Sequence, residues 1–145
     1  CRGVVNKTGQ IPAHTELYQV VLMTVKMVKE ELGLDVYIDH GSFDGWKAAP
    51  AAEKAGVPAI LGPREISANR FNDGPIFGMA AKYQEQGHTM IGFNTDAPVI
   101  PQQALPPQAA MAVRYGFHNS AADPSRGLTI IPDPAAGTAD PPSRL

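Results

Sequence analysis

The chain has 145 residues, of which 43% are hydrophobic and 18% charged, a composition typical of a folded domain rather than a disordered chain. Its net charge of −2 and its scattered lysines and arginines argue against nucleic acid or an anionic membrane as a partner. The single cysteine, Cys1, excludes an intrachain disulfide. No signal peptide is visible and no apolar run approaches the roughly 20 residues of a membrane span. Because the chain begins at Cys1 rather than Met, its compartment stays unassigned.

The segment over residues 15–33 is predicted to be a helix. Its apolar side chains recur at spacings of four, four, three and four, at Leu17, Val21, Val25, Val28 and Leu32. These spacings place them on one face of a helix. Thr15 is suited to begin the helix and Gly33 to end it.

Strands and helices alternate along most of the chain. Strands are predicted over residues 10–14, 34–40, 57–63 and 89–96. Further helices are predicted over residues 45–56, 75–87 and 108–116, with a polar loop over 64–74. Pro50 indicates a kink or a late start in the first of these helices, and Pro75 suits a first helical turn. Four consecutive β-α units of this kind predict an α/β fold with a parallel sheet and helices packed outside it.

The composition changes near residue 118. The segment "HNSAADPSRGLTIIPDPAAGTADPPSRL" is rich in proline, alanine and aspartate. It predicts one short helix over residues 119–127, followed by a tail. We therefore expect an α/β domain over residues 1–120 and a Pro/Ala-rich extension over residues 121–145.

Polar side chains follow several of the predicted strands. His14, His40 and Asp96 stand at strand ends, and Arg64 and Glu65 lie in the "GPRE" turn after another strand. In parallel α/β folds the carboxyl ends of the strands meet at one rim, where functional sites lie. Two imidazoles and a carboxylate that converge there are a plausible ligand set for a divalent transition metal.

Each of these residues also fits a structural role when taken alone. A single histidine at a strand end is more often structural or solvated than a metal ligand. Asp96 precedes Ala-Pro, and aspartate commonly starts a turn. Asp39 is either a helper for His40 or simply exposed. His88 and His118 fall at the opposite rim or in the tail, outside the predicted site.

Two other site types lack support in the sequence. Ser42 has no histidine and aspartate partners at motif spacing, which argues against a serine nucleophile. The glycines form neither a G-x-G-x-x-G pattern nor a P-loop, so nucleotide binding is unsupported.

Most of the chain, from about residue 11 to residue 131, resembles the C-terminal half of metal-dependent amidohydrolases of the imidazolonepropionase-like branch. The resemblance rests on "PAHTELYQVVLMTVKMVKEELGLDVYIDHGSFDGWKAAPAAEKAGVPAILGP", "GFNTDAPVIP" and "QAAMAVRYG". Its most specific parts are the strand-end histidine, "DHG" and "TDAP". The implied fold is half of a (β/α)8 TIM barrel, strands five to eight.

The resemblance implies a metal-dependent hydrolase that cleaves a C–N bond in an amide or cyclic amide of a small molecule. His14, His40 and Asp96 would bind the metal, most readily zinc, and Asp96 would also act as general base toward a metal-activated water. Arg64 and Glu65 are the local candidates for substrate binding.

The sequence also departs from this family. It lacks the family's His-x-His pair and the bridging ligand of the fourth strand, and a full barrel takes about 250 residues. Three interpretations remain open. Two copies could close a barrel as a homodimer, the chain could work with a reduced site of two histidines and one aspartate, or it could be a non-catalytic remnant or binding module. A metal-dependent esterase or lactamase activity fits the same chemistry.

Overall fold

The computed structural model describes residues 2–68 and 75–118, and it confirms the predicted α/β class. Four parallel strands form the main sheet, in the order β1-β2-β3-β6. They are β1 (Ile11–Thr15), β2 (Val36–His40), β3 (Ala59–Leu61) and β6 (Ile91–Phe93). A short helix before them, α1 (Arg2–Val5), is not predicted by the sequence.

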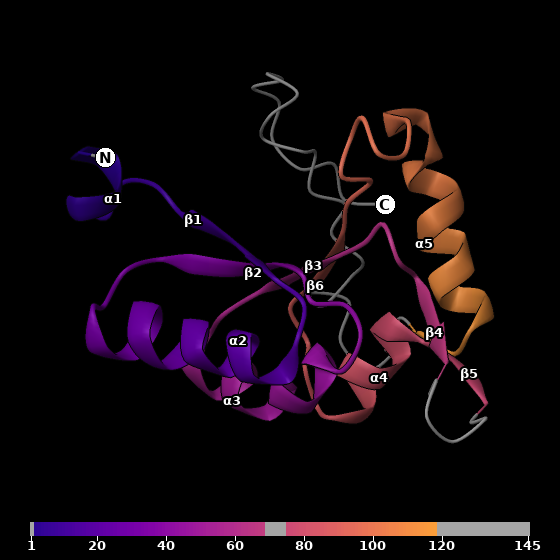
Figure 1. The fold of residues 1–145 in the computed structure, drawn as a ribbon, viewed down its shortest axis with the longest axis horizontal. Helices are drawn as coiled ribbons and strands as arrows, with labels where there is room; N and C mark the ends of the chain where they lie inside the picture. Colours follow the sequence, from indigo (N-terminus) through magenta and orange to yellow (C-terminus); the bar gives the residue numbers. More distant parts are fainter. Residues whose placement is uncertain (1, 69–74, 119–145) are drawn as a thin grey trace.

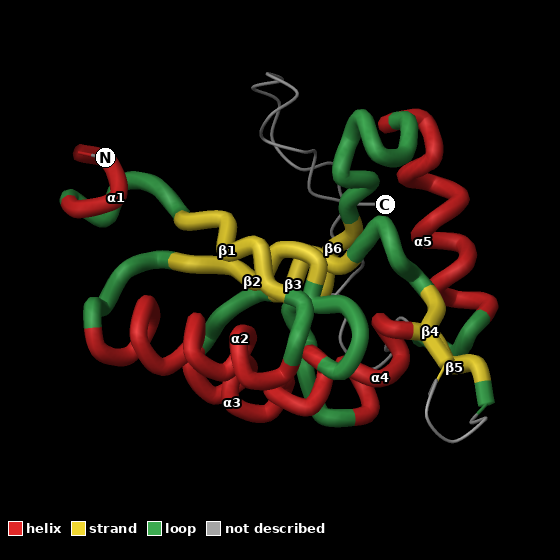
Figure 2. Tube along the Cα trace, viewed as in Figure 1, coloured by secondary structure: helices red, strands yellow, loops and turns green. Residues whose placement is uncertain are grey.

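Helices cover one face of this sheet (Figures 1 and 2). On that face lie α2 (Tyr18–Met23), η1 (Thr24–Glu31), η2 (Gly45–Ala48), α3 (Ala49–Ala55) and α4 (Met79–Glu85). The core between the two layers includes Ile38, Leu61 and Phe93 of the strands, Val21 of α2 and Val25 of η1, all fully buried. Burial of each such side chain stabilises the fold by about 1.5–3 kcal/mol.

The last helix, α5 (Leu105–Arg114), follows a short 3-10 turn, η3 (Gln102–Ala104), and packs against α4 and β6. Two prolines, Pro106 and Pro107, stand at its start, where a missing backbone N–H costs no helical hydrogen bond. The predicted helix over residues 108–116 is therefore present but begins earlier.

The predicted helix over residues 15–33 is present, but its second half is π-helical. Leu32 donates its backbone N–H to the carbonyl of Met27, five residues earlier. A π-helix turns less per residue than an α-helix, so the apolar stripe rotates away from the core. Val21 and Val25 are fully buried as expected, whereas Leu32, at the end of the π-helix, is 62% exposed. Leu17 precedes α2 and is 51% exposed.

The predicted helix over residues 45–56 is confirmed, with the late start that Pro50 indicates. A 3-10 turn occupies residues 45–48, α3 begins at Ala49, and Pro50 lies in its first turn. Gly56 ends the helix in a left-handed conformation, φ 66°, which a residue without a Cβ adopts readily.

The predicted polar loop is wrong over residues 66–68, and so is the helix start at Pro75, whereas residues 69–74 lie outside the described residues. Instead, β4 (Ile66–Ala68) pairs antiparallel with β5 (Ile76–Gly78), and α4 begins only at Met79. The β-branched and aromatic residues Ile66, Ile76 and Phe77 favour extended backbone, and cross-strand pairing satisfies that preference. The helix predicted over residues 75–87 does not account for this β4–β5 pair (Figure 1).

The predicted helix over residues 119–127 and the extension over residues 121–145 lie outside the described residues, so the domain boundary stays a prediction. Among the helices that the structure describes, none combines the length and the apolar character needed to cross a membrane.

Candidate metal centre

His14 of β1 and Asp39 and His40 of β2 come together where these strands end. Each offers a ligand atom, and these atoms all lie within 4.8 Å of one another. His40 Nε2 lies 3.1 Å from His14 Nδ1. The strand register explains part of this arrangement, because His14 is the direct neighbour of Asp39 in the parallel pair.

The backbone of His40 is left-handed, with φ 75°. In a regular strand, consecutive side chains point to opposite faces, which would separate His40 from Asp39. The left-handed turn at the strand end instead brings His40 Nε2 to 3.6 Å from Asp39 Oδ2. A positive φ at a non-glycine residue is uncommon and costs free energy, and such residues cluster at functional sites.

A backbone contact fixes the chemical form of the His40 ring. Its Nδ1 lies 2.5 Å from the carbonyl oxygen of Gly62, and a carbonyl can only accept a hydrogen bond. Nδ1 therefore carries the proton, and in the neutral ring Nε2 presents a lone pair toward His14 and Asp39. Histidines that bind metals are held in the same way by their second nitrogen.

Asp39 is held in place by Asn94, whose side-chain amide donates a 2.7 Å hydrogen bond to Asp39 Oδ1. The other carboxylate oxygen, Oδ2, lies near His40 Nε2. The sequence left open whether Asp39 is a helper for His40 or merely exposed. The structure makes it a third candidate ligand. Its register position beside His14 is the signal that could have identified it.

Asp96 lies at the rim, after β6. Its Oδ2 is 4.0 Å from His40 Nε2, its side chain is 42% exposed, and its backbone is also left-handed at φ 49°. The structure thus brings Asp96 beside His40, and His40 beside His14, as the strand-end argument predicts. Their roles as ligands remain a prediction.

The donor set fits a divalent metal. Two donors that each lie about 2.1 Å from a tetrahedral zinc are about 3.4 Å apart. The separations from His40 Nε2 are 3.1 Å to His14, 3.6 Å to Asp39 and 4.0 Å to Asp96. Imidazole nitrogens mixed with carboxylate oxygens are typical of zinc and related metals. The cluster is therefore able to hold a divalent metal.

The other predicted site residues, Arg64 and Glu65, point in different directions. The exposed guanidinium of Arg64 lies over the Phe43 ring, 4.7 Å from its centroid. Glu65 is buried and lines a separate cavity beside α5. Both residues contribute to the wall of that cavity, and their role in substrate binding stays a prediction.

The remaining histidines lie away from this centre. His88 is buried after α4, where its Nδ1 lies 3.3 Å from Glu53 Oε2, and burial lowers its pKa below the usual range. His118 joins the end of the described chain to α4, since its backbone exchanges hydrogen bonds with Gln84.

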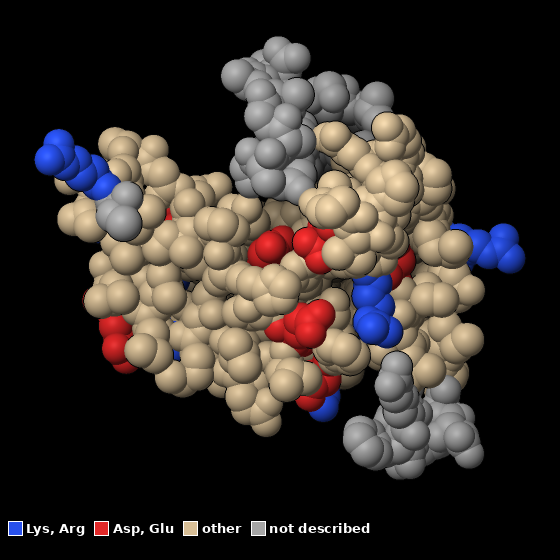
Figure 3. All heavy atoms as spheres, turned by 45° about the horizontal axis from the view of Figure 1, so that its top comes forward, with Lys and Arg blue, Asp and Glu red and all other residues tan. Residues whose placement is uncertain are grey.

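Acidic side chains gather near the middle of the face shown in Figure 3. A basic side chain lies beside them, and others project from the margins of the same face (Figure 3).

One solved structure with a clear likeness is an amidohydrolase from Thermotoga maritima MSB8, 26% identical, with a TM-score of 0.63. The match covers 81% of this chain and 30% of that chain. No family model matches the chain, and no curated protein matches it. The likeness supports an amidohydrolase-like fold and leaves the imidazolonepropionase-like branch unconfirmed. The fold is a partial TIM-barrel arrangement like that of an amidohydrolase.

Proposed function

We propose that this protein is a metal-dependent hydrolase that cleaves the C–N bond of an amide or cyclic amide. The observation that carries the proposal is the convergence of His14 Nδ1, His40 Nε2 and the carboxylates of Asp39 and Asp96 at the carboxyl ends of parallel strands. This rim is where α/β barrels carry their chemistry. The amidohydrolase-like fold supports the same reaction class.

Each residue has a distinct task in this proposal. His14 and His40 supply neutral nitrogens, with Gly62 holding the His40 ring and Asn94 holding Asp39. A bound zinc or similar ion lowers the pKa of water and polarises a carbonyl. Asp96 is the most exposed carboxylate beside His40, so it is placed to accept the proton of the attacking water and pass it to the leaving nitrogen.

The first expected result is near-stoichiometric metal. Protein purified without a metal-affinity column, stripped with a chelator and dialysed against zinc, should bind about one equivalent by plasma mass spectrometry. Hydrolysis of amide, lactam and ester substrates should disappear with the chelator and return with zinc. Failure to take up zinc, cobalt or manganese would overturn the proposal in favour of a non-catalytic binding module.

We further propose that two copies associate to close a barrel. Within the described residues β1 and β6 each pair on one side only, so both edges of the main sheet offer unpaired backbone groups. The helix that follows β1 exposes Val20, Met23 and Met27 at 46%, 49% and 45%. Beside β6, α5 exposes Met111 and Val113. Edge-to-edge pairing would bring these two apolar surfaces together.

Dimerisation predicts a specific mutational effect. The double variant Met23→Lys/Met27→Lys should shift the protein from dimer to monomer in sedimentation velocity, because it places charge in the apolar contact. Both side chains are about half exposed, so folding should change little. Ile76→Lys, at an exposed apolar position in the hairpin, is the matched control and should leave the mass unchanged. A wild-type chain that sediments as a monomer at all concentrations would contradict this proposal.

A further inference from the structure

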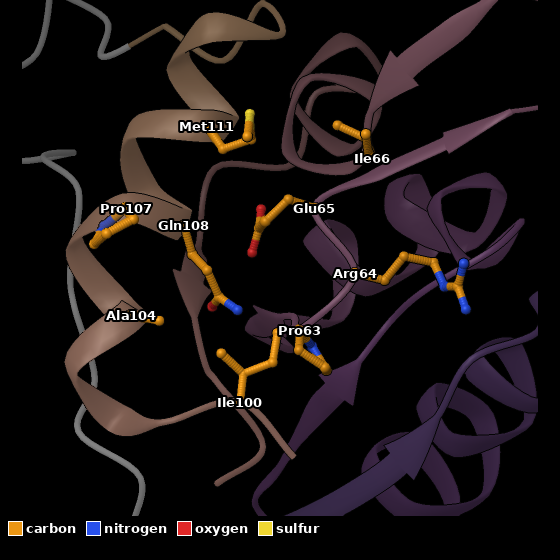
Figure 4. A pocket seen from close by; sticks show the side chains of 9 residues that line it. All are labelled: Pro63, Arg64, Glu65, Ile66, Ile100, Ala104, Pro107, Gln108 and Met111. Carbon is orange, nitrogen blue, oxygen red and sulfur yellow. The ribbon is translucent and has the colours of Figure 1, made fainter. Parts of the chain in front are cut away.

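A cavity of about 550 Å³ lies between the segment that follows β3 and helix α5 (Figure 4). Its volume is within the range of small-molecule sites, roughly 300–1,000 Å³. Most of its wall is apolar, formed by Pro63, Ile66, Ile100, Ala104, Pro107 and Met111. Such a wall suits the hydrocarbon part of a ligand.

Two polar side chains point into this cavity from opposite walls, Glu65 and Gln108 (Figure 4). Their residues are only 6% and 7% exposed. Within the described part of the chain, neither the carboxyl oxygens of Glu65 nor the side-chain amide of Gln108 has a hydrogen-bond partner. A buried polar group without a partner costs roughly 1–3 kcal/mol, and native proteins carry few of them. Four such atoms around one cavity indicate a ligand that supplies the missing partners.

The charges around the cavity narrow the choice of ligand. Arg64 and Glu65 are the titratable residues of the cavity wall, and Arg64 is directed away from the interior toward Phe43 (Figure 4). Among the described residues that line the cavity, no cationic group therefore points toward Glu65, and burial raises the pKa of Glu65 to about 8. A carboxyl in this setting disfavours anions and would gain most from a cation, which stabilises its charged form.

We propose that this cavity binds a small molecule with a positively charged nitrogen head, a guanidinium or alkylammonium, on an apolar body. Glu65 accepts hydrogen bonds from the head, the carbonyl oxygen of Gln108 accepts another, and the apolar wall holds the body. A guanidinium matches the two carboxylate oxygens with parallel N–H donors.

The cavity is tied to the candidate metal centre through one short segment. Gly62, whose carbonyl holds His40, precedes Pro63 and Glu65 along the chain. The same segment therefore contributes both to the candidate metal centre and to the cavity wall. The assignment of the cation as one end of the hydrolase substrate rests on the proposed function, whereas cation binding itself does not.

The test compares n-butylguanidinium with its neutral isostere n-butylurea by titration calorimetry on metal-free protein at pH 7. The guanidinium should bind at least 10-fold more tightly than the urea. Glu65→Gln should weaken guanidinium binding at least 10-fold, while Glu85→Gln, at an exposed carboxylate paired with Lys82, should not. Binding should release a proton, visible as a dependence of the heat on the ionisation enthalpy of the buffer.

Equal affinity for the two probes, or guanidinium binding that survives Glu65→Gln unchanged, would overturn the proposal. The variant His40→Ala separates it from the proposed function. If that variant and the wild type bind n-butylguanidinium equally while the wild type takes up no metal, the cation site stands and the hydrolase proposal fails. If the wild type binds metal and hydrolyses amides but neither probe binds, the hydrolase proposal stands and the cation site fails.

Discussion

His40→Ala and Asp96→Asn are each expected to lower metal affinity by more than about 100-fold and to remove hydrolytic turnover. Changes to residues that merely support a ligand typically cost 10–100-fold in affinity, and loss of a ligand atom should cost more. His40 Nε2 is the donor that the other candidate ligands surround, at 3.1 Å from His14 and 4.0 Å from Asp96. Metal content after dialysis and the rate of hydrolysis at saturating zinc measure the two effects.

Both variants should remain folded. Asn retains the size of Asp96 and tolerates its left-handed backbone, φ 49°, while it removes the charge. His40→Ala loses the hydrogen bond to Gly62 and leaves that carbonyl unpaired, which should cost about 1–3 kcal/mol of the free energy of unfolding. His40→Asn is a useful companion, because asparagine adopts the left-handed backbone of His40 more readily than alanine.

The matched control is Asp35→Asn, which removes a carboxylate that pairs with Lys29 before β2. It should leave metal content and turnover unchanged. Urea denaturation of all four variants separates loss of the site from loss of the fold. Unchanged metal content and turnover in His40→Ala and Asp96→Asn would show that these residues do not form the working site.

The order of strands and helices could be predicted from the sequence because hydrophobic periodicity is a local signal. The gathering of His14, His40 and Asp96 could be predicted as well, since parallel strands deliver their carboxyl ends to one rim. The short β4–β5 hairpin could not, because each strand has three residues and is stabilised by a partner rather than by its own pattern. The π-helix η1 likewise depends on backbone hydrogen bonds that hydrophobic periodicity does not reveal.

The finer features of the site depend on backbone geometry and distant contacts. Alternation along β2 predicts opposite directions for Asp39 and His40, and only the left-handed turn at His40 brings them together. Asn94 reaches Asp39 from another strand. Glu65 and Gln108 line the same cavity because α5 packs near the segment after β3, an arrangement that the sequence does not indicate.

The burial of the Glu65 carboxyl lowers the stability of the fold, and no local sequence pattern requires it to be buried. A buried carboxyl with no partner among the described residues destabilises the fold when it ionises, and a neutral side chain of the same size avoids that cost of ionisation. Proteins commonly give up stability at functional sites in this way. The stability of Glu65→Gln therefore bears on the proposed cation site independently of any ligand.

Glu65→Gln is expected to stabilise the free protein by roughly 3–5 kcal/mol at pH 8 and by little at pH 4.5. Burial raises the folded-state pKa of Glu65 from 4.5 to about 8. Between these values the folded protein binds more protons than the unfolded chain, so the wild type loses stability as pH rises through this window. Glutamine does not titrate, and its neutral amide occupies the same space as the protonated carboxyl.

Urea denaturation of wild type and variant at pH 4.5, 6.5 and 8 measures this effect as the difference between the two free energies of unfolding. The difference cancels contributions common to both proteins, including that of His88, whose lowered pKa makes stability fall as pH drops below about 6.5. Glu85→Gln, at an exposed carboxylate, should follow the wild-type curve. Parallel curves for Glu65→Gln and wild type would mean that folding leaves the pKa of Glu65 unchanged, so that Glu65 is not desolvated in the folded protein. That result would also contradict the buried, unpartnered carboxyl from which the cation site is argued.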